Sequence, residues 1–179
     1  MSFETGVDAY ERHAGRYADA LAAALMDRAE VRPGDRALDV GCGPGALLAA
    51  LEAQLGPGRV AGFDPSKPFV ELARQRVPGA DVRVARAEAL PFRDGSYDVV
   101  LSQLVVNFMS DPRVGVTEMR RVARRSVASC VWHYAGQMRM LRVFWDAALE
   151  VDPEAPDEGR IMRWCSPRSS GNCGAKRDS

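Results

Sequence analysis

Four residues early in the chain combine the types and spacing of a nucleoside-binding loop. Asp39, Gly41, Gly43 and Gly45 lie in the stretch LDVGCGPGALLAAL, where a short apolar run gives way to closely spaced glycines and then to Ala and Leu. Glycine lets the backbone turn sharply and lets a ligand approach main-chain atoms closely. A carboxylate beside the glycines accepts hydrogen bonds. The alternative is a tight strand-to-helix turn that needs glycine for its geometry alone.

A loop of this kind needs a strand before it and a helix after it, and the flanking sequence predicts both. Residues 36–40 form a short apolar run after the Pro33-Gly34 turn, and residues 46–54 are rich in strong helix formers. We also expect strands at 59–63, 81–86, 97–102 and 126–132, and helices at 16–29, 67–76, 112–123 and 138–149. This alternation predicts an α/β fold, a doubly wound and mostly parallel sheet with helices on both faces.

The composition excludes several classes of function. Of the 179 residues, 46% are hydrophobic and 27% are charged, and 24 basic residues balance 24 acidic ones. This balance provides no overall attraction to nucleic acid or to an anionic membrane, and no apolar run approaches the roughly 18 residues of a membrane span. The four cysteines, Cys42, Cys130, Cys165 and Cys173, have neither disulfide-framework nor metal-ligand spacing. We therefore expect no metal and, without a secretory signal, a cytoplasmic protein.

A second carboxylate ends the next predicted strand. Asp64 lies nineteen residues after Gly45 and closes the apolar run VAGFD. A carboxylate accepts two hydrogen bonds at once, which suits the two hydroxyls of a ribose. The alternative is an Asp that caps a helix or faces solvent. Further on, residues 87–92 read AEALPF and residues 94–100 read DGSYDVV.

The pattern Asp39-x-Gly41-x-Gly43-x-Gly45, together with Asp64 and the AEALPF segment, resembles the class I S-adenosylmethionine-dependent methyltransferases, in the subgroup that acts on small molecules. The resemblance covers residues 10–151. It implies a Rossmann-like fold, S-adenosylmethionine as the cofactor, and methyl transfer to an O, N or C nucleophile of a small-molecule acceptor. It also implies that the cofactor contacts Asp39, Gly41, Cys42, Gly43, Gly45, Asp64, Pro65, Ala87 and Glu88.

An NAD-dependent oxidoreductase is the less favoured alternative. The dinucleotide fingerprint is G-x-G-x-x-G, but here the third glycine comes one residue early and Ala46 takes its usual place. A carboxylate at position 39 would repel a pyrophosphate, whereas it would accept hydrogen bonds near an ammonium group. The negative charge of Asp39 therefore favours S-adenosylmethionine over NAD as the cofactor.

One position departs from the similar methyltransferases. Many of them carry an Asp two residues before the Glu of the AEALPF segment, where it accepts the adenine amino hydrogens, and this chain has Arg86 there. Arg has no acceptor. We therefore expect that contact either to be lost or to be taken over by backbone carbonyls and Glu88.

Further candidates lie outside these motifs. The resemblance implies that Arg16 pairs with the cofactor carboxylate, the alternative being an exposed helix charge. Gln103 is assigned to the cofactor site, and Gln103 and Asn107 could orient a polar substrate or simply stabilise their loop. His133, after the fifth predicted strand, is a candidate base or a packed or solvated histidine; the catalytic residues are otherwise unassigned. The cluster Arg120, Arg121, Arg124 and Arg125 is expected to be a solvated helix end.

The end of the chain departs from the resemblance. Related folds have seven strands, the last two forming an antiparallel hairpin, whereas five are predicted here, so we expect the hairpin to be missing. We expect a domain at residues 1–151, with a helical segment at 1–30, and an irregular tail at 152–179. Residues 168–179 can be encoded by a string whose shifted frame reads ELGELWREAGL, so a frameshift is a hypothesis that sequencing the gene would test. The alternative function is a non-catalytic remnant that at most binds the cofactor.

Overall fold

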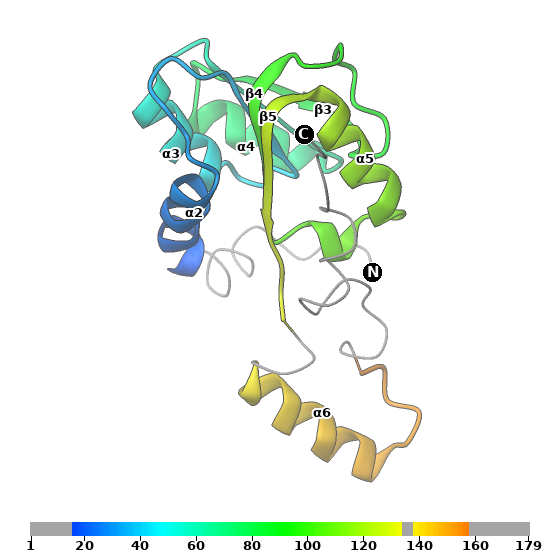
Figure 1. The fold of residues 1–179 in the computed structure, drawn as a ribbon. Coiled ribbons are helices and arrows are strands. Elements are labelled where there is room, and N and C mark those ends of the chain that lie inside the picture. Colours follow the sequence, from blue (N-terminus) through cyan, green and yellow to red (C-terminus); the bar gives the residue numbers. More distant parts are fainter. Residues whose placement is uncertain (1–15, 134–137, 158–179) are drawn as a thin grey trace.

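The computed structural model describes residues 16–133 and 138–157, and Figure 1 shows their fold. The predictions for residues 1–15 and 158–179 lie outside these described residues. The elements are α2 (Arg16–Arg28), β1 (Ala37–Val40), α3 (Ala46–Leu55), β2 (Val60–Asp64), α4 (Lys67–Arg76), β3 (Asp81–Val84), β4 (Tyr97–Gln103), the short 3-10 helix η2 (Val106–Phe108), α5 (Pro112–Val122), β5 (Ala123–Cys130) and α6 (Arg139–Val151).

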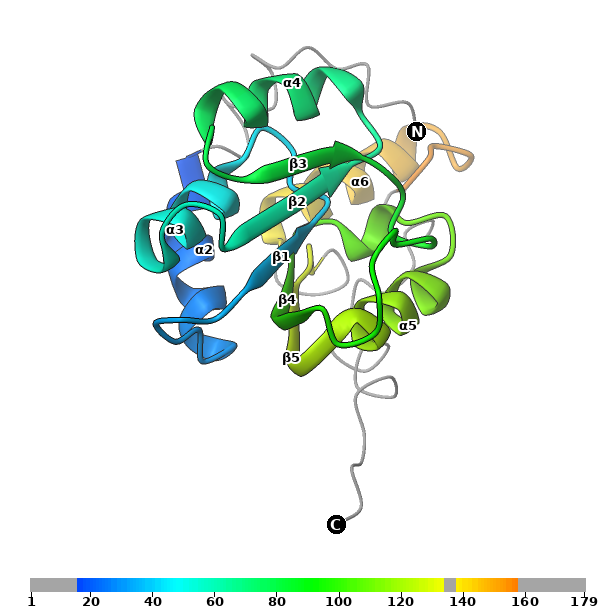
Figure 2. The same cartoon turned by 90° about the horizontal axis from the view of Figure 1, so that it is seen from above.

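The five strands form one parallel sheet in the order β3-β2-β1-β4-β5 (Figure 2). The first three strands run outward from β1, and the chain then crosses to the other side of β1 to form β4. This reversal between β1 and β4 is the switch point at which doubly wound sheets bind ligands, beyond the carboxyl ends of the strands. The α/β prediction is confirmed, with its parallel sheet and its alternation of strands and helices.

Helices cover both faces of the sheet, and each face has its own apolar core. Residues of α2, α3 and α4 form one core with Val99 and Leu101 of β4. Val100, which lies between them in sequence, belongs to the opposite core with Met119 of α5 and Phe63 of β2. This alternation follows from the two-residue period of a strand. Figure 2 shows α2 and α3 on one side of the strands and α5 on the other.

Two strand boundaries differ from the prediction. The third strand was expected to reach residue 86 but ends at Val84, because its partner strand β2 ends at Asp64, the residue paired with Val84; the N–H of Ala85 still donates to the carbonyl of Asp64 at 3.3 Å. The last strand was expected at 126–132 but spans Ala123–Cys130. It begins directly after α5, where Ala123 pairs with Tyr97 of β4, and both Arg124 and Arg125 have ion-pair partners there.

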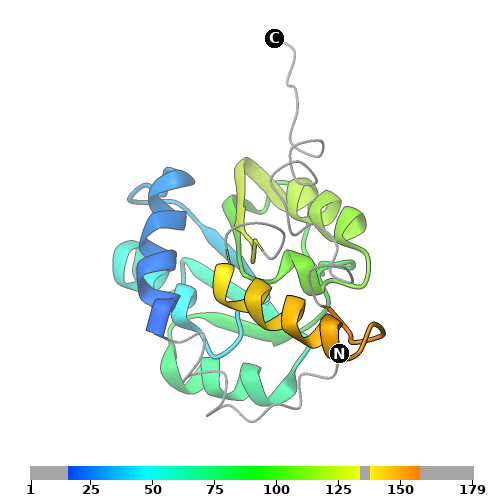
Figure 3. The same cartoon turned by 90° about the horizontal axis from the view of Figure 1, so that it is seen from below.

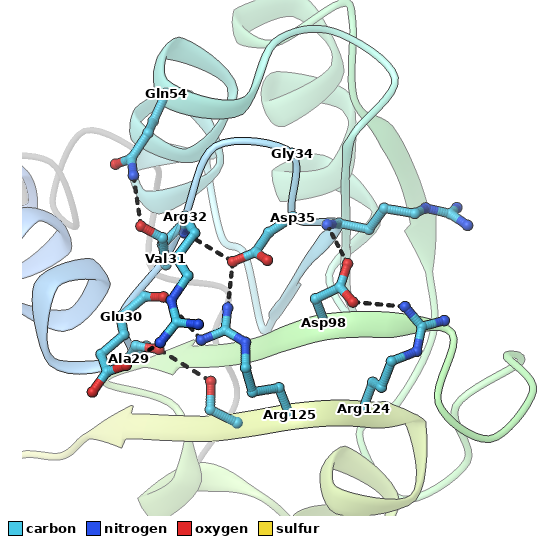
Figure 4. A network of polar contacts seen from close by, with 12 residues as sticks. Ala29, Glu30, Val31, Arg32, Gly34, Asp35, Gln54, Asp98, Arg124 and Arg125 are labelled. Carbon is cyan, nitrogen blue, oxygen red and sulfur yellow. Dashed lines mark hydrogen bonds and ion pairs between the residues drawn. The ribbon is translucent and has the colours of Figure 1, made fainter.

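These partners form a polar network at the amino ends of the strands (Figure 4). Arg125 pairs with the carboxylate of Asp35 and donates to the carbonyl of Glu30 at 3.0 Å. Arg124 pairs with Asp98 at 2.6 Å, and Asp98 also accepts the backbone N–H of Arg36 at 2.8 Å. The network ties the starts of β1, β4 and β5 together at the end of the sheet opposite the glycine loop.

The expectation of a solvated arginine helix end is therefore wrong for Arg121 and Arg125, which are half-buried, whereas Arg120 and Arg124 are exposed, Arg124 as a residue of β5. Arg121 pairs with Glu118 at 2.7 Å and with Asp94 at 2.8 Å. It also donates to the carbonyls of Phe92 and Leu90. Arg121 thus holds the connection between β3 and β4 against α5, which the one-dimensional pattern of charges did not reveal.

Helix α6 lies beyond the carboxyl ends of the strands (Figures 1 and 3). Arg142 of this helix pairs with the buried carboxylate of Asp157 at 2.8 Å and with Asp146 at 2.9 Å. Its Val143 and Phe144 are exposed. Among the helices of residues 16–133 and 138–157, we find none whose length and apolarity would allow it to cross a membrane.

Candidate cofactor-binding site

The glycine loop leaves β1 in backbone conformations that favour glycine. Gly41, Gly43 and Gly45 have φ values of 76°, 51° and 91°. At Gly41 the space is closed as well, since a Cβ would lie 2.5 Å from Cγ1 of Val105, which follows β4. The N–H groups of Gly41 and Cys42 both donate to the carbonyl of Phe63, at 2.8 and 3.0 Å. The loop is therefore pinned to the end of β2 and packed against the segment after β4.

Asp39 lies at the carboxyl end of β1, and its carboxylate is buried with only 1% of the residue exposed. Neither carboxylate oxygen has a hydrogen-bond partner among the described residues. Burial, and to a lesser extent the neighbouring Asp64, raises the pKa of Asp39 to about 8. A buried acceptor with no donor costs free energy unless a ligand satisfies it, so this carboxylate suits a ligand that brings N–H donors or positive charge.

Asp64, the last residue of β2, has a different environment. Its Oδ2 accepts the backbone N–H of Gly43 at 3.0 Å, and its Oδ1 accepts that of Ser66 at 2.8 Å. Burial raises the pKa of Asp64, and these two hydrogen bonds act in the opposite direction. A carboxylate has about four acceptor positions, so two remain for ligand hydroxyls. Pro65, the next residue, is exposed.

The segment after β3 lies beside Asp64 through the hydrogen bond from Ala85. Ala87 is buried and Arg86 is exposed, with its Nη1 3.4 Å from the hydroxyl of Ser110. The carboxylate of Glu88 accepts the backbone N–H of Asp111 at 3.1 Å. Glu88 thus supports the start of α5, and its contact with the adenine of the cofactor stays a prediction.

The end of β4 provides two amides whose orientation is set by backbone carbonyls. Nε2 of Gln103 donates to the carbonyl of Ala18 at 3.1 Å, and Nδ2 of Asn107 donates to that of Trp132 at 3.2 Å. Each amide therefore turns its NH₂ toward a carbonyl and leaves its oxygen as an acceptor. Both oxygens are buried without a partner in the described part of the chain. The amides do stabilise their loops, and they also leave free acceptors at the same end of the sheet as Asp39.

The remaining candidate site residues are Arg16, His133 and Cys42. Arg16 begins α2, but the prediction for its side chain lies outside the described residues. His133 is half-buried and follows Trp132, whose carbonyl Asn107 holds. Burial is the main cause that raises the pKa of the Cys42 thiol, well above its usual range, so Cys42 remains a small neutral residue of the loop rather than a nucleophile. In residues 16–133 and 138–157 no group of three or more His, Cys, Asp or Glu could hold a metal.

Two residues of the site escaped the sequence analysis. Val105 closes the space above Gly41, and Leu104 has a φ of 61° in the left-handed region, where its N–H donates to the carbonyl of Cys130 at 2.9 Å. Strained residues of this kind are frequent at functional sites. No local signal marks either residue, because both contacts depend on how β4 lies against β1 and β5.

Comparison with known proteins identifies the family. The family model described as a methyltransferase domain matches residues 38–129, about half of the chain. An uncharacterized 37.1 kDa protein in transposon TN4556 of Streptomyces fradiae is 40% identical over 104 residues, covering 56% of this chain and 30% of that protein. The ubiquinone/menaquinone biosynthesis C-methyltransferase UbiE of Stenotrophomonas maltophilia is 36% identical over 103 residues, covering 54% of this chain and 41% of UbiE.

A solved structure of a methyltransferase is also similar to this chain. A chain of the complex between the Haloferax volcanii Trm112 methyltransferase activator and a methyltransferase is 26% identical, with a TM-score of 0.64 over 84% of this chain and 70% of that chain. The matches to the two curated relatives span less than half of those proteins' own length. The family model covers β1 through β5, and S-adenosylmethionine is the cofactor of this class. The chain therefore belongs to the family of methyltransferase domains, among the class I S-adenosylmethionine-dependent methyltransferases.

Proposed function

We propose that the protein transfers the methyl group of S-adenosylmethionine to an O, N or C nucleophile of a small molecule and releases S-adenosylhomocysteine. The observation that carries this proposal is the buried carboxylate of Asp39, which has no partner in the described structure, beside a glycine loop that Asp64 holds in place. We assign the reaction to the cytoplasm on the sequence alone, with a small-molecule acceptor and no nucleic acid as partner.

The residues present fit this cofactor. Asp39 offers two free acceptor oxygens for the ammonium group of the methionine portion, and Asp64 has acceptor positions left for the ribose hydroxyls. Gly41 lets the loop between these two acids pack closely against Val105, because any side chain at position 41 would collide with Val105. These three features support a ligand that is a nucleoside at one end and a cation at the other.

Methyl transfer from a sulfonium needs little covalent catalysis by the protein. The bound sulfonium supplies an already activated methyl group, so the chain has to align the acceptor with it and exclude water. A base is needed only where the nucleophile must lose a proton. Gln103 and Asn107, whose free amide oxygens are buried at the carboxyl end of β4, are proposed to orient the acceptor, and His133 is the proposed base.

The names of the relatives suggest which acceptors to try first. UbiE is named as a ubiquinone/menaquinone biosynthesis C-methyltransferase, and a relative from Staphylococcus aureus, 36% identical over 104 residues, is named as a demethylmenaquinone methyltransferase. A ring carbon of a quinone-type molecule is therefore the first nucleophile that we propose to test, ahead of phenolic oxygens and amines.

A calorimetric titration with S-adenosylhomocysteine tests the cofactor assignment, with NADH as the control ligand. We expect micromolar binding of S-adenosylhomocysteine, no binding of NADH, and loss of binding in Asp64→Ala. Asp27→Ala serves as the matched control, because Asp27 is an exposed acid near the carboxyl end of α2 and is not a predicted site residue. A folded chain that binds neither ligand would refute the proposal. Binding without turnover on any acceptor would favour the non-catalytic alternative, and binding of NADH would favour the oxidoreductase.

A further inference from the structure

Asp39 and Asp64 lie at the ends of neighbouring strands, but their carboxylates differ in how they are satisfied. β1 and β2 pair so that Asp39 is opposite Gly62, two residues before Asp64. Both oxygens of Asp64 accept backbone N–H groups, whereas both oxygens of Asp39 are buried and have no partner among residues 16–133 and 138–157. A charge without hydrogen bonds in a buried site is unfavourable. In the described structure, the charged form of Asp64 is therefore stabilised by two hydrogen bonds, whereas that of Asp39 is stabilised by none.

The groups around Asp39 do not neutralise it. The charged side chain that acts on it is Asp64, a second acid, from β2. The titratable groups from the glycine loop and from β5 are the thiols of Cys42 and Cys130, and burial raises the pKa of both, so both are neutral. On α2, which packs against β4 and β5, Asp19 is exposed to solvent. Among the described residues, the acid thus faces acids and neutral groups, and none of them supplies a positive charge to it.

We propose that Asp39 is a proton-linked charge selector, neutral in the empty site and ionised, with its proton released to solvent, when the cationic end of a ligand enters. This inference rests on the proposed function, because it takes the ammonium group of the cofactor as the entering cation. It adds a requirement that the function alone does not contain: the site recognises charge by exchanging a proton for an ammonium group, so cofactor affinity depends on pH.

The direction of this dependence follows from linkage. In the free protein, burial holds the pKa of Asp39 at about 8, and a nearby cation lowers it. Below pH 8 the complex therefore binds fewer protons than its separated components, so affinity rises with pH, by at most about tenfold per pH unit, and levels off near pH 8. A ligand without the ammonium group leaves Asp39 protonated, and its affinity is unaffected by this residue across the same range.

Two ligands that contain the same nucleoside distinguish binding with an ammonium group from binding without one. S-adenosylhomocysteine carries an ammonium group, and 5′-methylthioadenosine, which ends in a methyl thioether, carries none. Calorimetry at pH 7 in two buffers of different ionisation enthalpy counts the protons exchanged on binding. We expect release of most of one proton with S-adenosylhomocysteine and none with 5′-methylthioadenosine. In Asp39→Asn, which keeps the shape of the side chain, the release with S-adenosylhomocysteine is expected to vanish, while Asp27→Asn behaves as the unaltered protein.

The outcomes separate this proposal from the proposed function. Binding of S-adenosylhomocysteine with no proton release, or with the same release in Asp39→Asn, overturns the role of Asp39 and leaves the cofactor assignment intact. No binding of either nucleoside by a folded chain overturns both. The ligand's own ammonium group titrates at higher pH, and the Asp39→Asn protein measures that contribution. If this variant does not fold, equal proton release with the two ligands in the unaltered protein is the result that refutes the proposal.

Discussion

The carboxylate of Asp64 accepts a hydrogen bond from the backbone N–H of Gly43 at 3.0 Å, across 21 residues of sequence. This contact joins the end of β2 to the middle of the glycine loop, and it is formed by an acid that is also predicted to bind the ribose. The side chain of Asp64 thus fixes the conformation of the glycine loop, and we predict that its remaining acceptor positions bind the ligand.

Replacement of Asp64 by Asn should therefore weaken cofactor binding more than the loss of one contact would. The amide offers a single acceptor oxygen for two backbone N–H groups, and it lacks the charge that strengthens hydrogen bonds to the ribose. Hydrogen bonds to charged groups are worth about 1.5–3 kcal/mol each, so we expect Kd for S-adenosylhomocysteine to rise by about 10- to 100-fold in a titration. An Asp64→Asn protein whose affinity stays within twofold of the unaltered chain would contradict this role.

Gly41→Ala should destabilise the fold and impair binding together. The Cβ would lie 2.5 Å from Cγ1 of Val105 at a φ of 76°, which combines left-handed strain with overpacking. We expect the free energy of unfolding in urea to fall by about 2–4 kcal/mol. The double variant Gly41→Ala/Val105→Ala relieves the collision but not the strain, so it should recover part of the loss. If it recovers nothing, the contact with Val105 is not the cause.

The stability of the empty protein should fall as pH rises, through Asp39. Burial raises the pKa of this carboxyl to about 8, whereas in the unfolded chain an Asp titrates near about 4. Between these two pKa values the folded state binds the proton that the unfolded state has lost. The free energy of unfolding therefore decreases with increasing pH, in total by about 5 kcal/mol between pH 4 and pH 8.

Denaturation curves at several pH values between 5 and 8 measure this slope. The Asp39→Asn protein should show a clearly smaller slope, and the difference between the two proteins isolates Asp39 from Asp64, whose pKa is also raised. Parallel slopes in the two proteins would show that Asp39 is ionised in the empty site.

Arg125→Met should reduce stability and leave cofactor binding unchanged. Arg125 pairs with Asp35 and donates to the carbonyl of Glu30, at the amino ends of the strands and far from the glycine loop in the parallel sheet. Its removal leaves the largely buried Asp35 carboxylate with one fewer partner, at a cost of about 1–3 kcal/mol. Urea denaturation measures the loss, and a titration with S-adenosylhomocysteine should return the same Kd. A changed Kd would show that the two ends of the sheet are coupled.

The elements of this protein were largely readable from the sequence because their causes are local. The helix Lys67–Arg76 lies where its start and stop signals predicted it, and β1, α3 and β2 agree with the prediction to within one residue at each end. The glycine loop was readable for the same reason, since a turn that requires positive φ selects glycine whatever surrounds it. The order of strands and helices then determined the fold class, and the motif residues determined the family.

What each polar side chain contacts was decided only by the tertiary structure. Arg125 and Asp35 are 90 residues apart, and Gln103 and the carbonyl of Ala18 are 85 apart, so no window of sequence contains either pair. For the same reason Arg121 and Arg125 were expected to be solvated, and β5 was expected to begin three residues too late. Asp39 is the clearest case. The sequence identified it as an acid beside a glycine loop. Its burial, and the lack of a donor in the described part of the chain, favour its protonated form, and they arise only when β1 is enclosed between β2 and β4.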